Sequence, residues 1–268
     1  MNRPVPILLY HSVSDEAAPK YQPWAISPAR FEKHMRFLRE SHYTSLTVSQ
    51  YVNALVKGLH LPKKTVVLTF DDGLADFYTG ALPILQQYNL VATLYVTTAY
   101  VGGTSKWLTP EGEGQRPMMT WQQIRALHHH GIEVGAHTRT HPQLDLVTTS
   151  RARGEIAQSK ADLETHLGQP VHSFAYPHGY FSRSVRNLVT QAGYQSACAV
   201  KHAMSARTDD RFALARIIVR GDSRLRELAA LLAGQGLPVA PKDERLRTKG
   251  WRLVRRSRYL LDTYLPKS

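Results

Sequence analysis

The segment Val66-Val67-Leu68-Thr69-Phe70-Asp71-Asp72-Gly73 places two adjacent carboxylates and a glycine directly after a run of apolar, mostly β-forming residues. Such a run, ended by a turn signal, is typical of a buried strand. Polar side chains at the carboxyl end of a parallel strand point into the mouth of an α/β fold. Asp-Gly pairs are also ordinary turn formers, so this segment alone indicates either a turn or a functional site.

Outward from this segment, short apolar runs alternate with amphipathic stretches, which is the pattern of a mostly parallel α/β fold. A helix beginning at Thr120 has a capping-box pattern with Gln123 and is expected to stop at Gly131. Strands are predicted at residues 7–10, 66–70, 92–96, 132–136, 173–176, 195–200 and 213–219, and further helices at 27–40, 75–88, 149–167, 182–192 and 222–233. The sequence therefore predicts one α/β domain over residues 1–233.

Composition agrees with one catalytic domain, because 268 residues with 43% hydrophobic residues can bury a full core. The single cysteine, Cys198, lies in an apolar run and is expected to be a buried structural thiol. The amino-terminal segment lacks the apolar core of a signal peptide, and no run approaches the roughly 20 apolar residues of a membrane span. These features predict a cytoplasmic protein.

Two segments interrupt the alternation before the carboxyl end. Residues 102–118, rich in Gly, Pro and Glu, are expected to form a long surface loop, and residues 234–241 a linker. Residues 242–268 hold nine Lys or Arg against three Asp or Glu, and their apolar positions fall near one helical face. This predicted basic amphipathic helix could pack on the domain, bind an acidic partner, or lie on an anionic membrane at the inner face of the cell membrane. Its few aromatic residues disfavour nucleic acid.

A second polar strand end is His137-Thr-Arg-Thr-His141-Pro142, which follows the predicted strand 132–136. Two histidines four residues apart can bind one ion if the segment makes a single turn, and imidazole suits zinc and related metals. Asp72 would supply a third ligand. Two histidines and one carboxylate leave coordination positions open, as in a catalytic metal site.

Two weaker signals end other predicted strands. Phe174-Ala175-Tyr176-Pro177-His178-Gly179 places a tight turn where backbone N–H groups could face a developing oxyanion. Leu9-Tyr10-His11-Ser12 ends the first strand with a histidine, and a lone histidine there is more often structural than functional.

Together these motifs resemble the polysaccharide deacetylases of carbohydrate esterase family 4, which contain the NodB homology domain. The TFDDG, HTRTHP and YPHG segments occur in the family's order over about residues 66–180, and with LLYHSV the similarity covers residues 5–220. The resemblance implies a distorted (β/α) barrel of about seven parallel strands. It also implies a divalent metal, usually zinc, and removal of acetyl groups from an N-acetylated sugar.

The resemblance further assigns roles to individual positions. Asp71 would be the catalytic base, and the backbone N–H of His178 would help to bind the oxyanion. The metal ligands would be Asp72, His137 and His141, and Tyr176 and Pro177 would shape the substrate groove.

The sequence departs from the family pattern in two places. Many members carry an arginine that braces the base, but Ala175 occupies that position here, so Arg216 is the candidate for orienting Asp71. The usual late Leu-x-Leu-His motif is also missing. The sequence is similar instead to the branch with an early Tyr-His strand end, which assigns the general acid to His11.

These expectations predict a metal-dependent hydrolase that deacetylates an oligo- or polysaccharide, in exopolysaccharide or cell-surface glycan synthesis. If the carboxyl-terminal helix touches a membrane, the substrate would be a lipid-linked sugar. Two alternatives stay open: a metal-dependent amidase acting on a non-sugar amide, and a basic binding module with a vestigial metal site.

Overall fold

The computed structural model describes residues 4–206, 208–240, 250, 254, 255 and 257. Its centre is a parallel sheet with strand order β10-β1-β5-β6-β7-β8-β9, and β4 pairs with β5 off this path. The strands are β1 Ile7–Tyr10, β4 Thr44–Leu46, β5 Thr65–Phe70, β6 Ala92–Val96, β7 Ile132–Ala136, β8 Ser173–Ala175, β9 Ser196–Cys198 and β10 Ile217–Ile218. Two short strands, β2 Ser12–Val13 and β3 Ala25–Ile26, pair with each other beside this sheet.

The last strand segment joins the two edges of the sheet. Leu214 forms a parallel bridge with Cys198 on β9. Three residues later, Ile217 pairs with Leu8 on β1. The distorted (β/α) barrel predicted from the sequence is therefore confirmed. Its final strand has two residues, fewer than the predicted strand 213–219.

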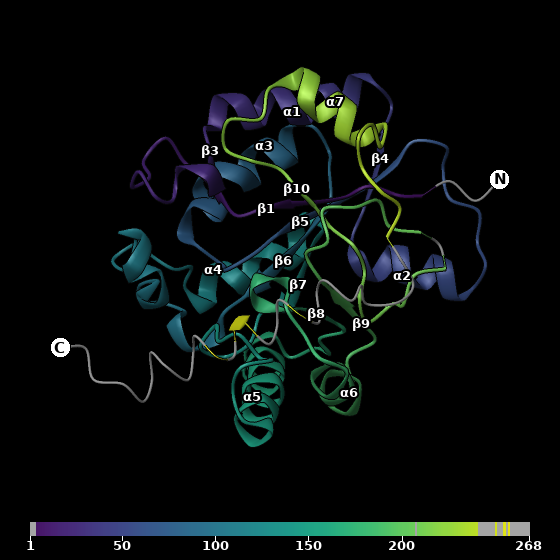
Figure 1. Ribbon diagram of the computed structural model, residues 1–268. Coiled ribbons are helices and arrows are strands. Elements are labelled where there is room, and N and C mark those ends of the chain that lie inside the picture. Colours follow the sequence, from purple (N-terminus) through teal and green to yellow (C-terminus); the bar gives the residue numbers. More distant parts are fainter. Residues whose placement is uncertain (1–3, 207, 241–249, 251–253, 256, 258–268) are drawn as a thin grey trace.

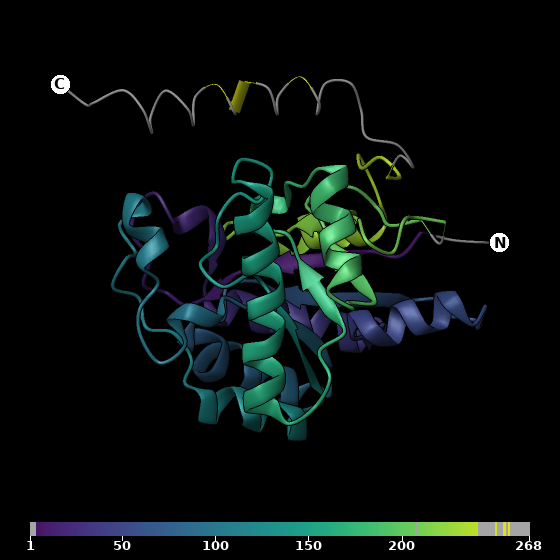
Figure 2. The ribbon, with the colours of Figure 1, turned by 90° about the horizontal axis from the view of Figure 1, so that it is seen from below.

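Helices surround this sheet (Figure 1). The helices α1, α3 and α7 lie together on one side of the strands, whereas α5 and α6 lie together on another. Figure 2 shows α5 and α6 side by side along the barrel wall. The α-helices are α1 Pro28–Glu40, α2 Val48–Val56, α3 Leu82–Gln87, α4 Trp121–Ala126, α5 Thr149–Leu167, α6 Arg183–Gln191 and α7 Leu225–Leu232.

The helix ends follow from local sequence. The Ser27 hydroxyl accepts a hydrogen bond from the Arg30 N–H at the start of α1, where Pro28 follows directly. Thr120 and Gln123 form the predicted capping box of α4. Gly131 takes a left-handed conformation at φ 69° after the short 3₁₀ helix that continues α4. These local signals place β7 and its polar end.

Five features differ from the sequence prediction. The helix α2 and the strand β4 were not expected, and the expected helix over 75–88 begins as a π-helix at Phe77–Ala81 before α3. The loop 102–118 contains a 3₁₀ helix, η4 Lys106–Glu111, and folds back to pair Met118 with Leu74. The expected linker is attached up to residue 240, because the Ala240 N–H donates to the Met204 carbonyl at 2.9 Å.

The carboxyl-terminal helix predicted over 242–268 lies almost entirely outside the described residues. Gly250, Val254, Arg255 and Ser257 are described, and all four are helical. No helix in the described part of the chain is long and apolar enough to span a bilayer. Cys198 is buried on β9 and accepts a hydrogen bond from the Tyr95 hydroxyl at 3.4 Å, as expected for a structural thiol.

Candidate active site

The carboxyl ends of neighbouring parallel strands bring the predicted site residues together. His11 follows β1, Asp71 and Asp72 follow β5, and His137 follows β7. Because all these strands run in the same direction, their carboxyl ends open into one mouth. The sheet therefore brings together side chains that are sixty or more residues apart in the sequence.

Asp72, His137 and His141 form a group that could hold a metal ion, with ligand atoms all within 4.8 Å of one another. The two histidine Nε2 atoms are 3.2 Å apart, and Asp72 Oδ1 lies 3.4 Å from His141 Nε2 and 3.7 Å from His137 Nε2. Ligand atoms about 2.0–2.2 Å from a tetrahedral zinc would be separated by roughly 3.3–3.6 Å. The spacing of the three side chains thus fits one cation.

Hydrogen bonding also suits a cation at this position. His137 Nδ1 lies 2.8 Å from the Ala175 carbonyl, so the Nδ1 proton is donated there and Nε2 keeps its lone pair for the cluster. Asp72 Oδ1 is buried without a hydrogen-bond partner among the described residues. Burial, followed by the charge of His137, lowers the pKa of His141, so its imidazole is in the neutral form that binds metals. A cation bound here would be coordinated by the two Nε2 lone pairs and by the unpaired carboxylate oxygen of Asp72.

Asp71 has a different partner. Arg216 holds it with two parallel bonds, from Nη1 to Oδ1 at 2.6 Å and from Nη2 to Oδ2 at 2.7 Å. The Arg216 side chain is fully buried, and its Nε donates to the Ala199 carbonyl at 3.1 Å. Burial raises the pKa of Asp71, but the positive charge of Arg216, followed by His137, lowers it by more, so the pKa lies below its usual value. The carboxylate is therefore ionised and fixed in orientation, beside the cluster but outside its ligand set.

His11 lies at the same mouth, with its ring centroid 5.0 Å from that of Trp24. Its Nδ1 is buried and has no partner among the described residues. Burial lowers the pKa of His11 to about 4, and the negative charge of Asp71 acts in the opposite direction. The imidazole is thus close to Asp71 and uncharged at neutral pH.

The third motif supports the site mainly through its backbone. His178 takes a positive φ of 55°, and its ring centroid lies 4.9 Å from that of His141. The side chains of Tyr176 and Pro177 are buried, and the Tyr176 hydroxyl donates to the Phe212 carbonyl at 2.9 Å. The role of these two residues in shaping the substrate groove stays a prediction.

Backbone strain is concentrated at this mouth. Four non-glycine residues with positive φ lie here: Asp72, Thr138, His141 and His178. Such conformations cost on the order of 1–3 kcal/mol each and persist where the surroundings enforce them. Two of the four, Asp72 and His141, belong to the metal-ligand group. Their strained backbone therefore lowers stability at the positions where the direction of a ligand side chain is important.

One residue that sequence reasoning missed fixes the histidine turn. Glu155, on α5, accepts from the N–H groups of Arg139 at 2.9 Å and Thr140 at 2.7 Å. The Thr138 hydroxyl accepts from the His141 N–H at 3.0 Å. Glu155 is 8% exposed, and a buried acid in a predicted amphipathic helix was the available signal.

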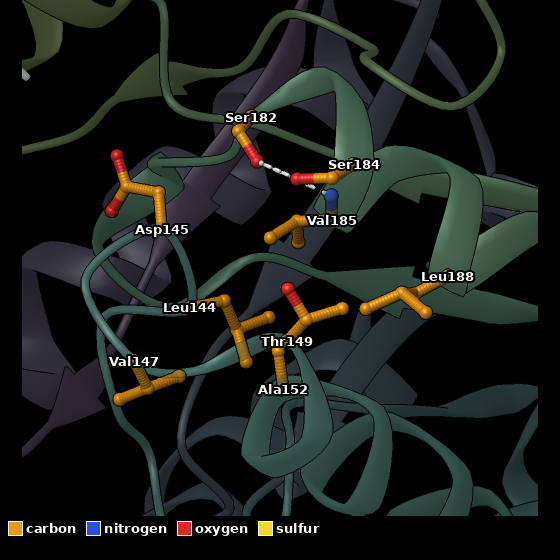
Figure 3. A pocket seen from close by; sticks show the side chains of 9 residues that line it. All are labelled: Leu144, Asp145, Val147, Thr149, Ala152, Ser182, Ser184, Val185 and Leu188. Atoms are coloured by element: carbon orange, nitrogen blue, oxygen red, sulfur yellow. Dashed lines mark hydrogen bonds between the residues drawn. The ribbon is translucent and has the colours of Figure 1, made fainter.

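A separate pocket lies beside the site, between α5 and α6 (Figure 3). Its lining combines apolar side chains with the polar side chains of one aspartate, one threonine and two serines, and contains none of the clustered histidines. The one carboxylate there, Asp145, is paired with Arg255 of the carboxyl-terminal segment at 2.6 Å. Arg255 also lies over the Tyr180 ring at 3.6 Å, so this segment contacts the barrel near His178. The lining residues are Leu144, Asp145, Val147, Thr149, Ala152, Ser182, Ser184, Val185 and Leu188.

Comparison with known proteins agrees with this geometry. A family model described as polysaccharide deacetylase matches residues 59–197, which include both polar motifs. The chain belongs to the polysaccharide deacetylase family. The fold, the hydrolase class and the membership of carbohydrate esterase family 4 expected from the sequence are therefore confirmed.

Individual relatives of this deacetylase have low sequence identity to it, but the matches cover most of this chain. YxkH of Bacillus subtilis (strain 168), assigned to the polysaccharide deacetylases, is 27% identical over 80% of this chain and 71% of its own length. The poly-beta-1,6-N-acetyl-D-glucosamine N-deacetylase of Escherichia coli (strain K12) is 25% identical over 82% of this chain. The match spans only 37% of that relative.

The solved structure of Streptococcus pyogenes deacetylase PplD in complex with acetate superposes on this deacetylase with a TM-score of 0.75. The identity is 25%, and the match covers 87% of this chain and 99% of that one. IcaB from Ammonifex degensii, at 24% identity and a TM-score of 0.72, shares the fold.

Proposed function

We propose that this enzyme uses one divalent cation, zinc by preference, to remove acetyl groups from N-acetylglucosamine units of a β-1,6-linked polysaccharide. The observation that carries the proposal is the buried triad of Asp72, His137 and His141 directly beside the Arg216-braced Asp71. The names of the E. coli and Staphylococcus aureus relatives, both poly-beta-1,6-N-acetyl-D-glucosamine N-deacetylases, support the choice of sugar. Two imidazoles and one carboxylate support the choice of zinc.

The chain's own residues would divide the work of amide hydrolysis. Asp72, His137 and His141 would hold the zinc ion, which would lower the pKa of a water molecule and polarise an acetamide carbonyl. Asp71, ionised and fixed by Arg216, accepts a proton from the attacking water. The backbone N–H of His178 stabilises the oxyanion of the tetrahedral intermediate. The proton taken up by Asp71 would then move to the neutral His11 imidazole, and His11 would donate it to the leaving amine as the carbon–nitrogen bond breaks, giving acetate and a glucosamine unit.

Acetate release from β-1,6-linked N-acetylglucosamine oligomers by zinc-reconstituted protein tests the proposal. The Asp71→Asn variant should bind zinc with the wild-type affinity but lose turnover. His137→Ala should lose zinc itself, and chelated wild-type protein should be inactive. Full activity in Asp71→Asn, or zinc-independent activity, would contradict the assignment. Zinc binding without acetate release from any sugar oligomer would favour the alternative, an amidase for non-sugar amides.

We further propose that residues 242–268 contact an anionic membrane surface on the cytoplasmic side, where a lipid-linked sugar would be the substrate. Their excess of six positive charges, from nine Lys or Arg less three Asp or Glu, supports this proposal. The ion pair of Arg255 with Asp145 would keep this segment next to the catalytic mouth. Sedimentation with anionic liposomes, compared between the full chain and a chain ending at residue 241, tests it. Equal pelleting of the two forms would refute it.

A further inference from the structure

Three buried polar atoms lie near the metal-ligand triad without a hydrogen-bond partner in the described part of the chain. They are the Tyr21 hydroxyl oxygen, the Trp107 indole nitrogen Nε1 and the Glu111 carboxylate oxygen Oε2. An unpaired polar group away from water is costly, and an unpaired carboxylate is especially so. A group of such atoms in one place indicates that a ligand completes their hydrogen bonds.

Contacts place these atoms at the mouth of the site. Tyr21, only 2% exposed, packs in one apolar cluster that Trp107 also joins. The Trp107 ring lies against the metal-ligand candidate His141, with centroids 5.3 Å apart. Glu111 follows on the same 3₁₀ helix, Lys106–Glu111. The loop 102–118 thus supplies an indole and a carboxylate to one wall of the mouth.

Glu111 differs from the other carboxylates on this side of the site. Asp76 and Glu113 both pair with Arg116, at 3.1 Å and 3.0 Å. Among the ion pairs of the described residues Glu111 has none, and it is not a member of the triad that could bind a metal. Its negative charge acts on Asp72, whose pKa is raised first by burial and then by Asp71, Asp76 and Glu111. The 3₁₀ helix Lys106–Glu111 therefore carries one carboxylate without an ion-pair partner among the described residues, and the same helix carries Trp107.

We propose that Glu111 binds the ammonium group of a glucosamine unit next to the N-acetylglucosamine that is hydrolysed, and that the Trp107 indole N–H and the Tyr21 hydroxyl hydrogen-bond to hydroxyl groups of that glucosamine unit. This inference rests on the proposed deacetylase function. An ammonium group compensates the carboxylate charge through a charge-assisted hydrogen bond, and a sugar hydroxyl offers the acceptor that the indole N–H lacks. An acetamido or hydroxyl group offers no charge and would leave the carboxylate uncompensated.

The proposal links successive turnovers. Each hydrolysis converts an acetamide into an amine, which is protonated near neutral pH. That amine is the group that the Glu111 subsite prefers on the neighbouring sugar. The enzyme would therefore act faster next to a glucosamine unit that it has already made, and glucosamine units would appear in blocks along the polysaccharide.

Two β-1,6-linked tetramers test this preference, one fully acetylated and one carrying a single glucosamine unit. Wild-type enzyme should show a higher kcat/KM on the second, by about tenfold, the effect of one charge-assisted hydrogen bond. Glu111→Gln should lower kcat/KM for the glucosamine tetramer to that for the acetylated one. The matched control is Glu16→Gln, which removes the same charge from an exposed side chain outside the Glu111 subsite and should keep the preference.

Binding provides a readout that does not depend on turnover. Calorimetry on zinc-loaded Asp71→Asn protein should show tighter binding of the glucosamine tetramer, and the added Glu111→Gln change should abolish the difference. Equal kcat/KM on both tetramers, or a preference that survives Glu111→Gln, would overturn the proposal. Weaker zinc binding by Glu111→Gln would also overturn it, because the carboxylate would then serve the metal. No acetate release from either tetramer would instead refute the proposed deacetylase function.

Discussion

Replacing Arg216 by methionine would remove the only charged partner that the described residues offer to the Asp71 oxygens within 3 Å. The bidentate bonds of 2.6 Å and 2.7 Å would be lost, while Asp71 would remain 3% exposed. Removing one member of a buried ion pair typically destabilises a protein by roughly 3–5 kcal/mol. We expect a lower Tm and a fall of that size in the free energy of unfolding.

Catalysis should change in a direction fixed by the pKa of Asp71. Burial raises this pKa and Arg216 is the largest influence that lowers it, so the pKa should rise when Arg216 is lost. A base with a raised pKa is protonated over more of the acidic range, so the acid limb of the pH–rate profile should move to higher pH. We expect kcat to fall on the order of 100-fold, the usual contribution of a positioned base. Acetate release measured across pH at saturating zinc gives both quantities.

Two further variants separate the causes. Arg216→Lys keeps the positive charge but loses the two parallel N–H donors of the guanidinium. It should therefore shift the acid limb of the pH–rate profile less than Arg216→Met does. Asp71→Asn combined with Arg216→Met should be more stable than the sum of the single losses predicts, because the buried carboxylate is then absent. An unchanged acid limb and unchanged kcat in Arg216→Met would refute the idea that this arginine positions the base.

Two other predictions concern supporting residues. Glu155→Gln should weaken zinc binding about 10- to 100-fold, because the side chain that accepts from the Arg139 and Thr140 N–H groups loses its charge. A zinc titration measures this, and unchanged affinity would contradict it. Burial lowers the pKa of His34 to about 4, below the 6.5 of an exposed histidine, so the unfolded chain binds more protons between these values and stability is lost as pH falls through them. His34→Gln should remove about 3 kcal/mol of this acid destabilisation, seen as a flatter dependence of Tm on pH from 7 to 4; an equal slope in both proteins would disprove it.

Sequence reasoning worked best where strand ends carried distinctive polar residues. The Asp-Asp-Gly and His-Thr-Arg-Thr-His segments follow strongly apolar runs, and the structure brings both to one mouth. Arg216 could be chosen because it lies in the predicted strand 213–219 and a guanidinium can hold a carboxylate with two parallel hydrogen bonds. The bidentate bonds to Asp71 follow from the way that segment crosses the closing edge of the sheet.

What the sequence could not show depends on tertiary contacts. The strand β4 has only three residues, and pairing with β5 rather than local propensity places it. Residues 102–118 have no helical or strand periodicity, so nothing local indicated that Trp107 would pack against His141. The resemblance to the family assigned Tyr176 to the substrate groove; its side chain is buried, and that role stays a prediction.

The segment that joins β9 to β1 also carries Arg216, so the brace of the base sits on the seam of the barrel. Consider a folding intermediate in which all the remaining strands have paired but the segment that carries Arg216 has not yet joined β9 to β1. Its metal ligands would be in place, but Asp71 would lack the hydrogen bonds from Arg216. Such an intermediate would bind zinc and yet be catalytically silent. During refolding, recovery of acetate release would therefore lag behind recovery of zinc binding, and enzymatic activity would report the last step of barrel closure.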